Sequence, residues 1–262
     1  MTLSQDLALA RQLADVSDRL AVGRKPADVR CWAKEDGSEI TELDLAIEEA
    51  LLEILTRECP NDAILAEESG ASRSAHPANG RRWLIDPLDG TRHFLSGGKH
   101  WGTHIALEEA GRVVVGIITR PTQGVYYWAA LGHGAWLSRN GECAVQRLCL
   151  TSHCDLATAK VVGLVDEPIP LVGAVRAAAH WVEDEPMVID ALLGGRVDAL
   201  IDVGGNAWDQ APLTLLVTEA RGSFSDPQGG HRIDCGFGLY SSNPDLHAQL
   251  WAVVAPYLQK GG

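Results

Sequence analysis

The stretch Trp83-Leu84-Ile85-Asp86-Pro87-Leu88-Asp89-Gly90-Thr91 organises the rest of this 262-residue chain. Its first three residues are apolar and indicate a short buried strand, which Pro87 and Gly90 then interrupt. Asp86 and Asp89 are therefore expected where a strand gives way to a turn. Carboxylates in such a place suit Mg²⁺, although Asp and Gly are also ordinary turn residues, so this stretch alone leaves both interpretations open.

The composition indicates a globular protein. A length of 262 residues fits one large domain or two closely packed halves, and an apolar content of 46% is ample for a core. No apolar run approaches the length of a membrane span, and residues 1–20 mix charged and apolar side chains. The start of the chain therefore predicts an amphipathic helix rather than a signal peptide, and we expect a cytoplasmic protein without a membrane partner.

The charge restricts the partners. A formal net charge of −13 argues against nucleic acid, whose phosphate backbone needs a basic face. A small phosphorylated metabolite remains compatible if a metal ion supplies positive charge locally. The six cysteines lack paired spacing and favour reduced thiols; Cys143, Cys149 and Cys154 with His153 could suggest zinc, but Cys-x2-Cys spacing is missing.

Apolar periodicity predicts an alternation of helices and strands through the whole chain. Helices are expected over residues 3–22, 41–57, 170–180, 211–220 and 244–259, and residues 186–193 are expected to be part of another helix. Strands are expected over 63–66, 83–86, 103–107, 113–119, 125–130, 160–165, 197–203 and 239–242. Residues 23–38 predict a loop or loose hairpin, and Asn140-Gly141 is a hairpin signal that favours a partly antiparallel sheet. We expect two packed αβ halves, 1–150 and 151–262, in one compact unit.

Acidic residues lie at the ends of several predicted elements: Asp44, Glu67, Asp86, Asp89 and Asp209. If they converge, they form a cage of oxygen ligands that favours Mg²⁺ or Mn²⁺ over zinc. Two such ions about 3.5–4 Å apart would hold the attacking and leaving oxygens of a phosphoryl displacement.

Each of these acids also has a structural explanation. Asp44 lies three residues after Thr41, as in a capping box, and Asp209 has the same relation to Asn206. Glu67, beside Glu68, fits a solvated strand end.

Three ordered motifs resemble the inositol monophosphatase-like family of Mg²⁺-dependent, lithium-sensitive phosphatases. They are residues 66–70 (Ala-Glu-Glu-Ser-Gly), residues 83–94 (Trp-Leu-Ile-Asp-Pro-Leu-Asp-Gly-Thr-Arg-His-Phe), and residues 208–212 (Trp-Asp-Gln-Ala-Pro) followed by residues 217–222 (Val-Thr-Glu-Ala-Arg-Gly). The resemblance covers nearly the whole chain. It implies a layered αβαβα sandwich of the inositol monophosphatase and fructose-1,6-bisphosphatase type, and a homodimer.

The resemblance also implies a set of metal ligands. Glu67, Asp86 and the Leu88 carbonyl oxygen would bind a first Mg²⁺, and Asp86, Asp89 and Asp209 would bind a second. Glu67 would help to position a third, weaker ion, and Mn²⁺ could substitute.

Catalytic roles follow from the same resemblance. Thr91, hydrogen-bonded towards Asp44, would orient and deprotonate the attacking water. The amides of Asp89, Gly90 and Thr91 would hold the phosphate, and Lys34 would lie on a mobile loop that closes over the site.

The substrate is the least determined feature. The spacing from Lys34 to Asp44 resembles the histidinol-phosphatase branch, whereas Glu183 replaces a glycine in the substrate loop of relatives. Asp184 and Asp202, together with Asp209, are expected to face the substrate, where carboxylates would attract the amine of L-histidinol phosphate.

Other substrates and roles stay open. Neutral polyols also accept carboxylate partners, so inositol 1-phosphate and other sugar, cyclitol or nucleotide phosphates are alternatives. The acidic run 183–185 could equally be a solvated surface. A non-catalytic phosphate-binding relative is a further alternative, which the intact set of acidic residues disfavours.

Overall fold

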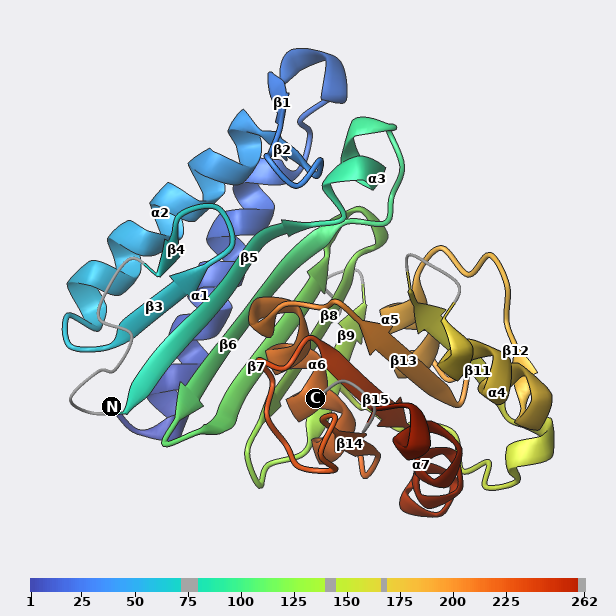
Figure 1. Ribbon diagram of the computed structural model, residues 1–262. Coiled ribbons are helices and arrows are strands. Elements are labelled where there is room, and N and C mark those ends of the chain that lie inside the picture. The colour runs from blue at the N-terminus through green and yellow to red at the C-terminus, as the bar shows by residue number, and fades with distance from the viewer. Residues whose placement is uncertain (72–79, 140–144, 166–168, 259–262) are drawn as a thin grey trace.

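The chain folds into five alternating layers of helix and sheet (Figure 1). The computed structural model describes residues 1–71, 80–139, 145–165 and 169–258. This architecture confirms the predicted αβαβα sandwich. Among the described residues, no helix combines the length and the apolar character needed to cross a membrane.

The first helical layer consists of α1 (Leu3–Ala21) and α2 (Glu42–Glu58), which lie side by side on one face of the larger sheet (Figure 1). Both begin with a capping box, which satisfies backbone N–H groups at the helix start. Leu13 of α1 and Ile47 of α2 are fully buried, as is Trp83 of the sheet beneath them. Burial of these apolar faces anchors the helices to the sheet.

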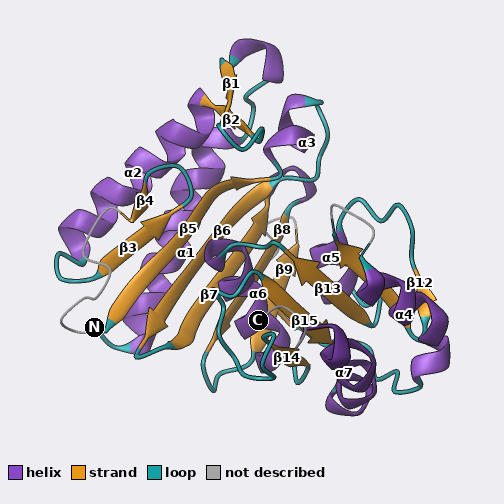
Figure 2. Cartoon of the chain, in the orientation of Figure 1, coloured by secondary structure: helices purple, strands orange, loops and turns teal. Residues whose placement is uncertain are grey.

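The larger sheet has eight strands in the order β10-β9-β8-β7-β6-β5-β3-β4 (Figure 2). Their bounds are β3 Ala63–Ala66, β4 Gly70–Ala71, β5 Arg81–Asp89, β6 Gly102–Glu109, β7 Arg112–Arg120, β8 Val125–Ala130, β9 Ala135–Arg139 and β10 Gln146–Arg147. Only the β3–β5 pair is parallel, and the other described pairs of this sheet are antiparallel. The sheet is therefore antiparallel in large part, as predicted.

The middle layer is formed by α5 (Val188–Leu193) and α6 (Ala207–Glu219), which lie between the two sheets. α6 is apolar on all sides, as expected of a helix covered on two faces. Gly116 of β7 allows the close approach, since a Cβ atom there would lie 3.0 Å from Pro212 of α6. This contact brings the start of α6, with Asp209, towards the end of β5.

The smaller sheet has five strands in the order β12-β11-β13-β15-β14, with α4 (Pro170–Ala178) and α7 (Pro244–Leu258) on its outer face. The strands are β11 Lys160–Leu164, β12 His180–Trp181, β13 Ala199–Val203, β14 Ser223–Ser225 and β15 Phe237–Ser241. β11 and β13 are parallel, and their register places Leu164 opposite Asp202. Their carboxyl ends face the same cavity as the end of β5.

Several details differ from the sequence prediction. α6 begins at residue 207 rather than 211, whereas residues 31–41 form a hairpin, β1 (Cys31–Ala33) and β2 (Glu39–Thr41), largely within the stretch where a loop or loose hairpin was expected. The short elements α3 (Thr91–Leu95), β4, β9, β10, β12 and β14 were not predicted, because two to five residues carry too little periodicity. The hairpin signal Asn140-Gly141 lies outside the described residues. The division into two halves at residue 150 stays a prediction. α6 of the second half packs on the first sheet, so the two halves are in close contact.

Candidate metal centre

The end of β5 positions the two central carboxylates. The pairing of β5 with β6 runs regularly to Asp86 opposite His104 and resumes only at Asp89 opposite Gly102. Pro87 lies within this irregularity and has no N–H for the ladder. The Leu88 N–H donates to Asp86 Oδ1 (2.9 Å), which holds the carboxylate in the turn.

Gly90 completes the turn and has a left-handed backbone with φ of 82°. A Cβ atom at this position would lie 2.4 Å from the His100 carbonyl oxygen, so only glycine fits. The chain can therefore turn directly from β5 into α3, which begins with Thr91.

A cavity of about 240 Å³ lies where the two sheets and α6 meet. Its lining includes most of the predicted site residues: Glu67, Asp86, Leu88, Asp89, Gly90, Thr91, Asp202 and Asp209. The rest of the lining consists of Leu164, Ile189, Gly205, Asn206 and Trp208. The structure thus brings together carboxylates that are far apart in the sequence.

The carboxylates of Asp86, Asp89 and Asp209 and the imidazole of His104 offer ligand atoms within 4.8 Å of one another. Burial, together with the nearby carboxylates of Glu67 and Asp89, raises the pKa of Asp86 and of Asp209 well above the ordinary range. A divalent cation bound among these carboxylates would neutralise their charge and relieve their mutual repulsion. The oxygen-rich donor set fits Mg²⁺ or Mn²⁺.

Asp89 is in a different electrostatic environment. Burial opposes its ionisation, yet His104 and Arg120 hold the pKa of its carboxyl below the usual value. Asp89 Oδ2 lies 3.2 Å from His104 Nε2 and 3.0 Å from Arg120 Nη2. Arg120 also donates from Nε to Asp190 Oδ2, at 2.9 Å.

The sequence analysis did not identify His104, Arg120 or Asp190. A histidine inside an apolar strand and an arginine at the end of another were visible signals. Neither residue could be assigned to the site from the sequence, because their contacts with Asp89 and Asp190 depend on strand register and on the packing of α5.

Thr91 and Asp44 contact each other as predicted from the resemblance. The Thr91 hydroxyl lies 3.1 Å from Asp44 Oδ1 and 3.0 Å from the Leu88 carbonyl oxygen. Asp44 Oδ2 accepts from the N–H (2.8 Å) and the hydroxyl of Thr41, so Asp44 is also part of the α2 capping box. Burial raises the pKa of Asp44.

Lys34 reaches the site from the turn between β1 and β2. Its Nζ lies 2.8 Å from Glu67 Oε1 and 2.7 Å from Glu68 Oε2. Burial, partly offset by Lys34, raises the pKa of Glu68 to about 7. Because Glu67 pairs with Lys34, it is not a freely solvated strand end.

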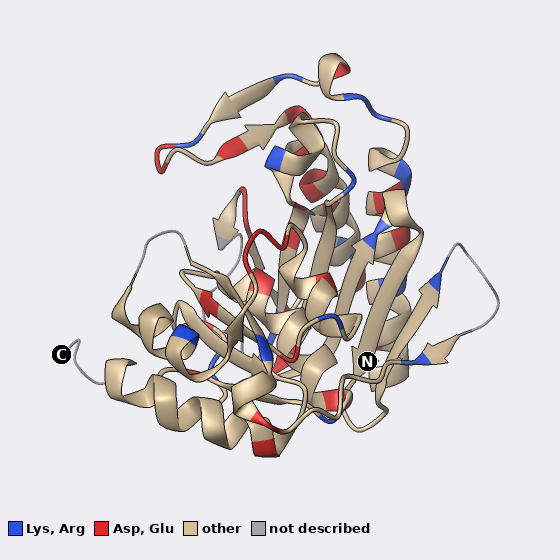
Figure 3. Ribbon diagram, turned by 90° about the vertical axis from the view of Figure 1, so that its right-hand side faces the viewer, with Lys and Arg blue, Asp and Glu red and all other residues tan. Residues whose placement is uncertain are grey.

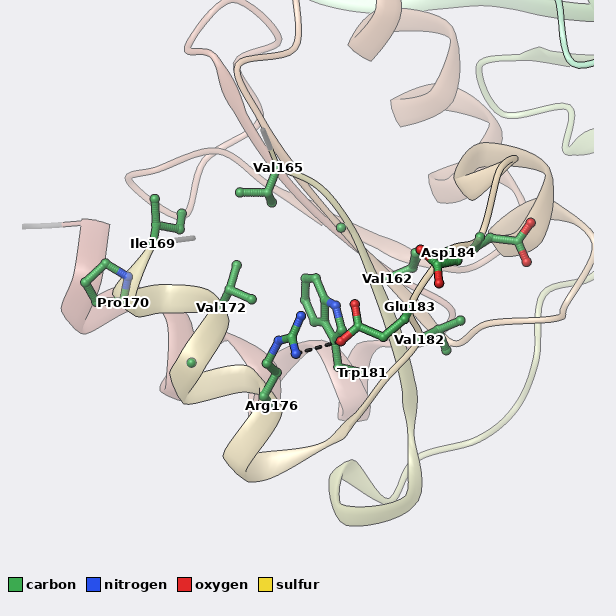
Figure 4. A pocket seen from close by; sticks show the side chains of 13 residues that line it. Val162, Val165, Ile169, Pro170, Val172, Arg176, Trp181, Val182, Glu183 and Asp184 are labelled. Carbon is green, nitrogen blue, oxygen red and sulfur yellow. Dashed lines mark ion pairs between the residues drawn. The ribbon is translucent and has the colours of Figure 1, made fainter. Parts of the chain in front are cut away.

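The two predicted specificity residues lie in different places. Asp202 lines the 240 Å³ cavity, and its Oδ2 accepts from Gln210 Nε2 at 2.9 Å. Asp184 instead lines a second pocket of about 780 Å³ between β11 and α4 (Figure 4). It is exposed and has a φ of 53°, a region that Asp tolerates better than most residues.

The acidic run around Asp184 makes its own ion pairs. Arg176 Nη1 lies 2.6 Å from Glu183 Oε1, beside the ring of Trp181 (Figure 4), and Arg196 pairs with Glu185 at 3.0 Å. In the ribbon of Figure 3, the positions of Lys and Arg are spread over several elements rather than gathered on one. In the alternative zinc group, Cys149 and Cys154 are exposed, and Cys143 lies outside the described residues.

Known proteins match this chain over nearly its full length, although the relatives carry different names. The family model described as "Inositol monophosphatase family" matches residues 4–259. The histidinol-phosphatase of Chlorobaculum parvum is 32% identical over 96% of this chain and 97% of its own. A Streptomyces griseus protein named glucose-1-phosphate thymidylyltransferase is 44% identical over 91% of this chain and 92% of its own.

A solved structure shows the same fold. The extragenic suppressor protein suhB of Bartonella henselae superposes with a TM-score of 0.81 at 24% identity, covering 98% of this chain and 100% of the other. The chain belongs to the inositol monophosphatase family and is a phosphoric monoester hydrolase of that family.

Proposed function

We propose that this protein is a Mg²⁺-dependent phosphatase that hydrolyses L-histidinol phosphate to L-histidinol and phosphate. The observation that carries the proposal is the meeting of Asp86, Asp89 and Asp209, within 4.8 Å, in a cavity that Thr91 also lines. Glu67, Asp86 and the Leu88 carbonyl oxygen would hold one ion, and Asp86, Asp89 and Asp209 a second.

The chain's own residues would prepare the attacking water. Bound divalent cations supply positive charge to the phosphoryl group and increase the acidity of a water molecule. Thr91 donates its hydroxyl proton to Asp44 Oδ1, which leaves an oxygen lone pair facing the water. Asp44 can then take up the proton that Thr91 relays, since burial raises the pKa of its carboxyl and so makes the carboxylate a better proton acceptor.

Asp202 supports a substrate that carries an amine. It lines the same cavity as the metal ligands, where its carboxylate accepts from Gln210 and from the backbone of Gly205. The 32% identity to a histidinol-phosphatase supports the same assignment. Asp184, in the second pocket, would act only on a leaving group long enough to reach past β11.

A panel of phosphate esters tests the substrate. L-Histidinol phosphate, inositol 1-phosphate and glucose 1-phosphate should be compared by phosphate release with and without Mg²⁺. The family description motivates the inositol ester, and the name of the Streptomyces griseus relative motivates the glucose ester. A kcat/KM highest for histidinol phosphate supports the proposal; a preference for either other ester contradicts it.

Two further assays test the reaction class. Pyrophosphate release from dTTP and glucose 1-phosphate would reveal nucleotidyl transfer, which the name of the same relative suggests for that protein. Absence of p-nitrophenyl phosphate hydrolysis at any Mg²⁺ concentration would instead support a phosphate-binding relative that has lost catalysis.

Other properties belong to the same proposal. We expect a role in histidine biosynthesis, inhibition by lithium, replacement of Mg²⁺ by Mn²⁺, a homodimer, and a cytoplasmic location. Sedimentation at micromolar concentration tests the dimer, and fractionation of cells that express the chain tests the location.

A further inference from the structure

Arg120 is a buried cation in direct contact with a proposed metal ligand. Its side chain is 3% exposed, and its Nη2 lies 3.0 Å from Asp89 Oδ2. Its Nε lies 2.9 Å from Asp190 Oδ2 on α5, whose side chain is 8% exposed. Arg120 ends β7 and belongs to none of the motifs that define the family resemblance.

Arg120 contacts Asp89 from the protein side. Asp89 lines the cavity, whereas Arg120 is not among the described residues that form its wall. A cation in the cavity would therefore meet Asp89 but not the guanidinium group. Arg120 can influence such a cation only through charge and through the Asp89 carboxylate.

The charges around Asp89 give this contact a direction. A guanidinium group stays protonated, so Arg120 is a fixed positive charge. Its positive charge offsets part of the negative charge that Asp89 presents to the cavity, and it repels a cation there. Asp190, on the other side of Arg120, offsets part of that positive charge.

We infer that Arg120 is a built-in counter-charge that weakens cation binding at Asp89 and Asp209, and that Asp190 limits its strength. The inference rests on the proposed metal site. In the metal-free protein the same contact relieves repulsion among the crowded carboxylates. By this inference, the contact stabilises the group of carboxylates when no cation is bound and lowers their affinity for one.

Mn²⁺ binding to the metal-free protein, measured by calorimetry, tests this role. Arg120→Gln should tighten the weaker Mn²⁺ site by about ten-fold, opposite in direction to the loss of about 10–100-fold that usually follows when a group contacting a metal ligand is replaced. Asp190→Asn should weaken the same site, because it leaves the full charge of Arg120 on Asp89. Arg120→Lys keeps the charge and should stay closer to wild type than Arg120→Gln.

The opposite directions make the test specific. Both single substitutions break the same 2.9 Å ion pair. A merely structural role for that pair would therefore shift Mn²⁺ affinity the same way in both variants. Weaker Mn²⁺ binding in both Arg120→Gln and Asp190→Asn overturns the inference.

A paired substitution covers the case in which Arg120→Gln does not fold, since removing one partner leaves the other charge buried and unpaired. The double variant Arg120→Gln with Asp190→Asn removes both charges and can keep a hydrogen bond. It should bind Mn²⁺ more tightly than wild type, because the lost positive charge is nearer to Asp89. Weaker binding in the double variant contradicts the counter-charge.

The same titration separates this inference from the proposed function. A wild-type protein that binds no Mn²⁺ contradicts the metal site and, with it, the proposed reaction. Mn²⁺ binding in which all variants weaken contradicts only the role of Arg120. No substrate is present, so the identity of the phosphate ester does not affect the outcome.

Discussion

Replacing Thr91 by Ala removes the hydroxyl group that links Asp44 to the cavity. In the native protein this hydroxyl lies 3.1 Å from Asp44 Oδ1, whereas Asp44 Oδ2 accepts from the N–H of Thr41 at 2.8 Å. Asp44 Oδ1 is therefore the oxygen that Thr91 can use. The variant leaves Asp86, Asp89 and Asp209 in place, so it separates the treatment of the water from the binding of the ions.

The expected loss can be estimated from these contacts. A positioned general base contributes about 10²–10⁴-fold to the rate. At 1.36 kcal/mol for each factor of ten, this corresponds to about 2.7–5.4 kcal/mol in the activation barrier. Loss of one hydrogen bond to a charged group should also lower the free energy of unfolding by about 1.5–3 kcal/mol.

The assay compares kcat at saturating substrate with the Mg²⁺ concentration that gives half-maximal rate. Thr91→Ala should lower kcat at least 100-fold, the lower end of the range of about 10²–10⁴, and leave the Mg²⁺ requirement nearly unchanged. Thr91→Ser keeps the hydroxyl and is the matched control. If the rate and the Mg²⁺ affinity fall together, Thr91 is a ligand or a structural cap and the relay to Asp44 is refuted.

Four further predictions concern the same cavity. Asp86→Asn should raise the activation barrier by about 4–7 kcal/mol with the fold retained, and a variant with a tenth of wild-type activity would refute a bridging role for Asp86. Asp202→Asn should lower kcat/KM for histidinol phosphate by about ten-fold or more, because a charge-assisted hydrogen bond to the amine is lost. Hydrolysis of glycerol 2-phosphate, which has no amine, should stay nearly unchanged. Equal losses for both substrates would mean that Asp202 supports the metal site instead. Burial and mutual repulsion raise the pKa of Asp86 and of Asp209 in the folded protein. Without metal, the stability that these two groups contribute is therefore fully present below their pKa of 3.8 in the unfolded chain. It is lost as the pH rises through their higher pKa values in the folded protein. Mg²⁺ binds the ionised carboxylates and should therefore raise the unfolding temperature more at about pH 8 than at about pH 5, in scanning calorimetry; a constant increment contradicts this. Millimolar lithium should inhibit turnover, more strongly as Mg²⁺ rises, and insensitivity at saturating Mg²⁺ counts against a weakly held ion that leaves with the product.

Local patterns in the sequence determined much of the fold. The helical periodicity of residues 3–22 and 41–57 matches α1 and α2 to within a residue, because one apolar face and one capping box specify each helix. The strand before Asp86 was equally clear, since apolar residues end at Pro87 and Gly90. The three motifs in their order also indicated the family, which no single pattern could have done.

Asp44 and Asp209 illustrate what local patterns leave open. Both acids form the capping boxes that their spacing predicts. Asp209 also lines the cavity, and Asp44 accepts a hydrogen bond from Thr91, which lines it. The sequence presented these as alternatives. In the folded chain a carboxylate has two oxygens, so one residue can satisfy a helix end and still contribute to a site.

Tertiary structure alone decided the electrostatics of the centre. His104 reaches Asp89 through the register of β5 against β6, and Arg120 reaches Asp190 across 70 positions of sequence. It also placed Asp202 in the 240 Å³ cavity and Asp184 in a different pocket, although both had been expected to face the substrate. Periodicity and turn chemistry act between near neighbours and can be read from sequence. Strand register and the packing of α5 and α6 depend on side chains that meet only after the chain has folded.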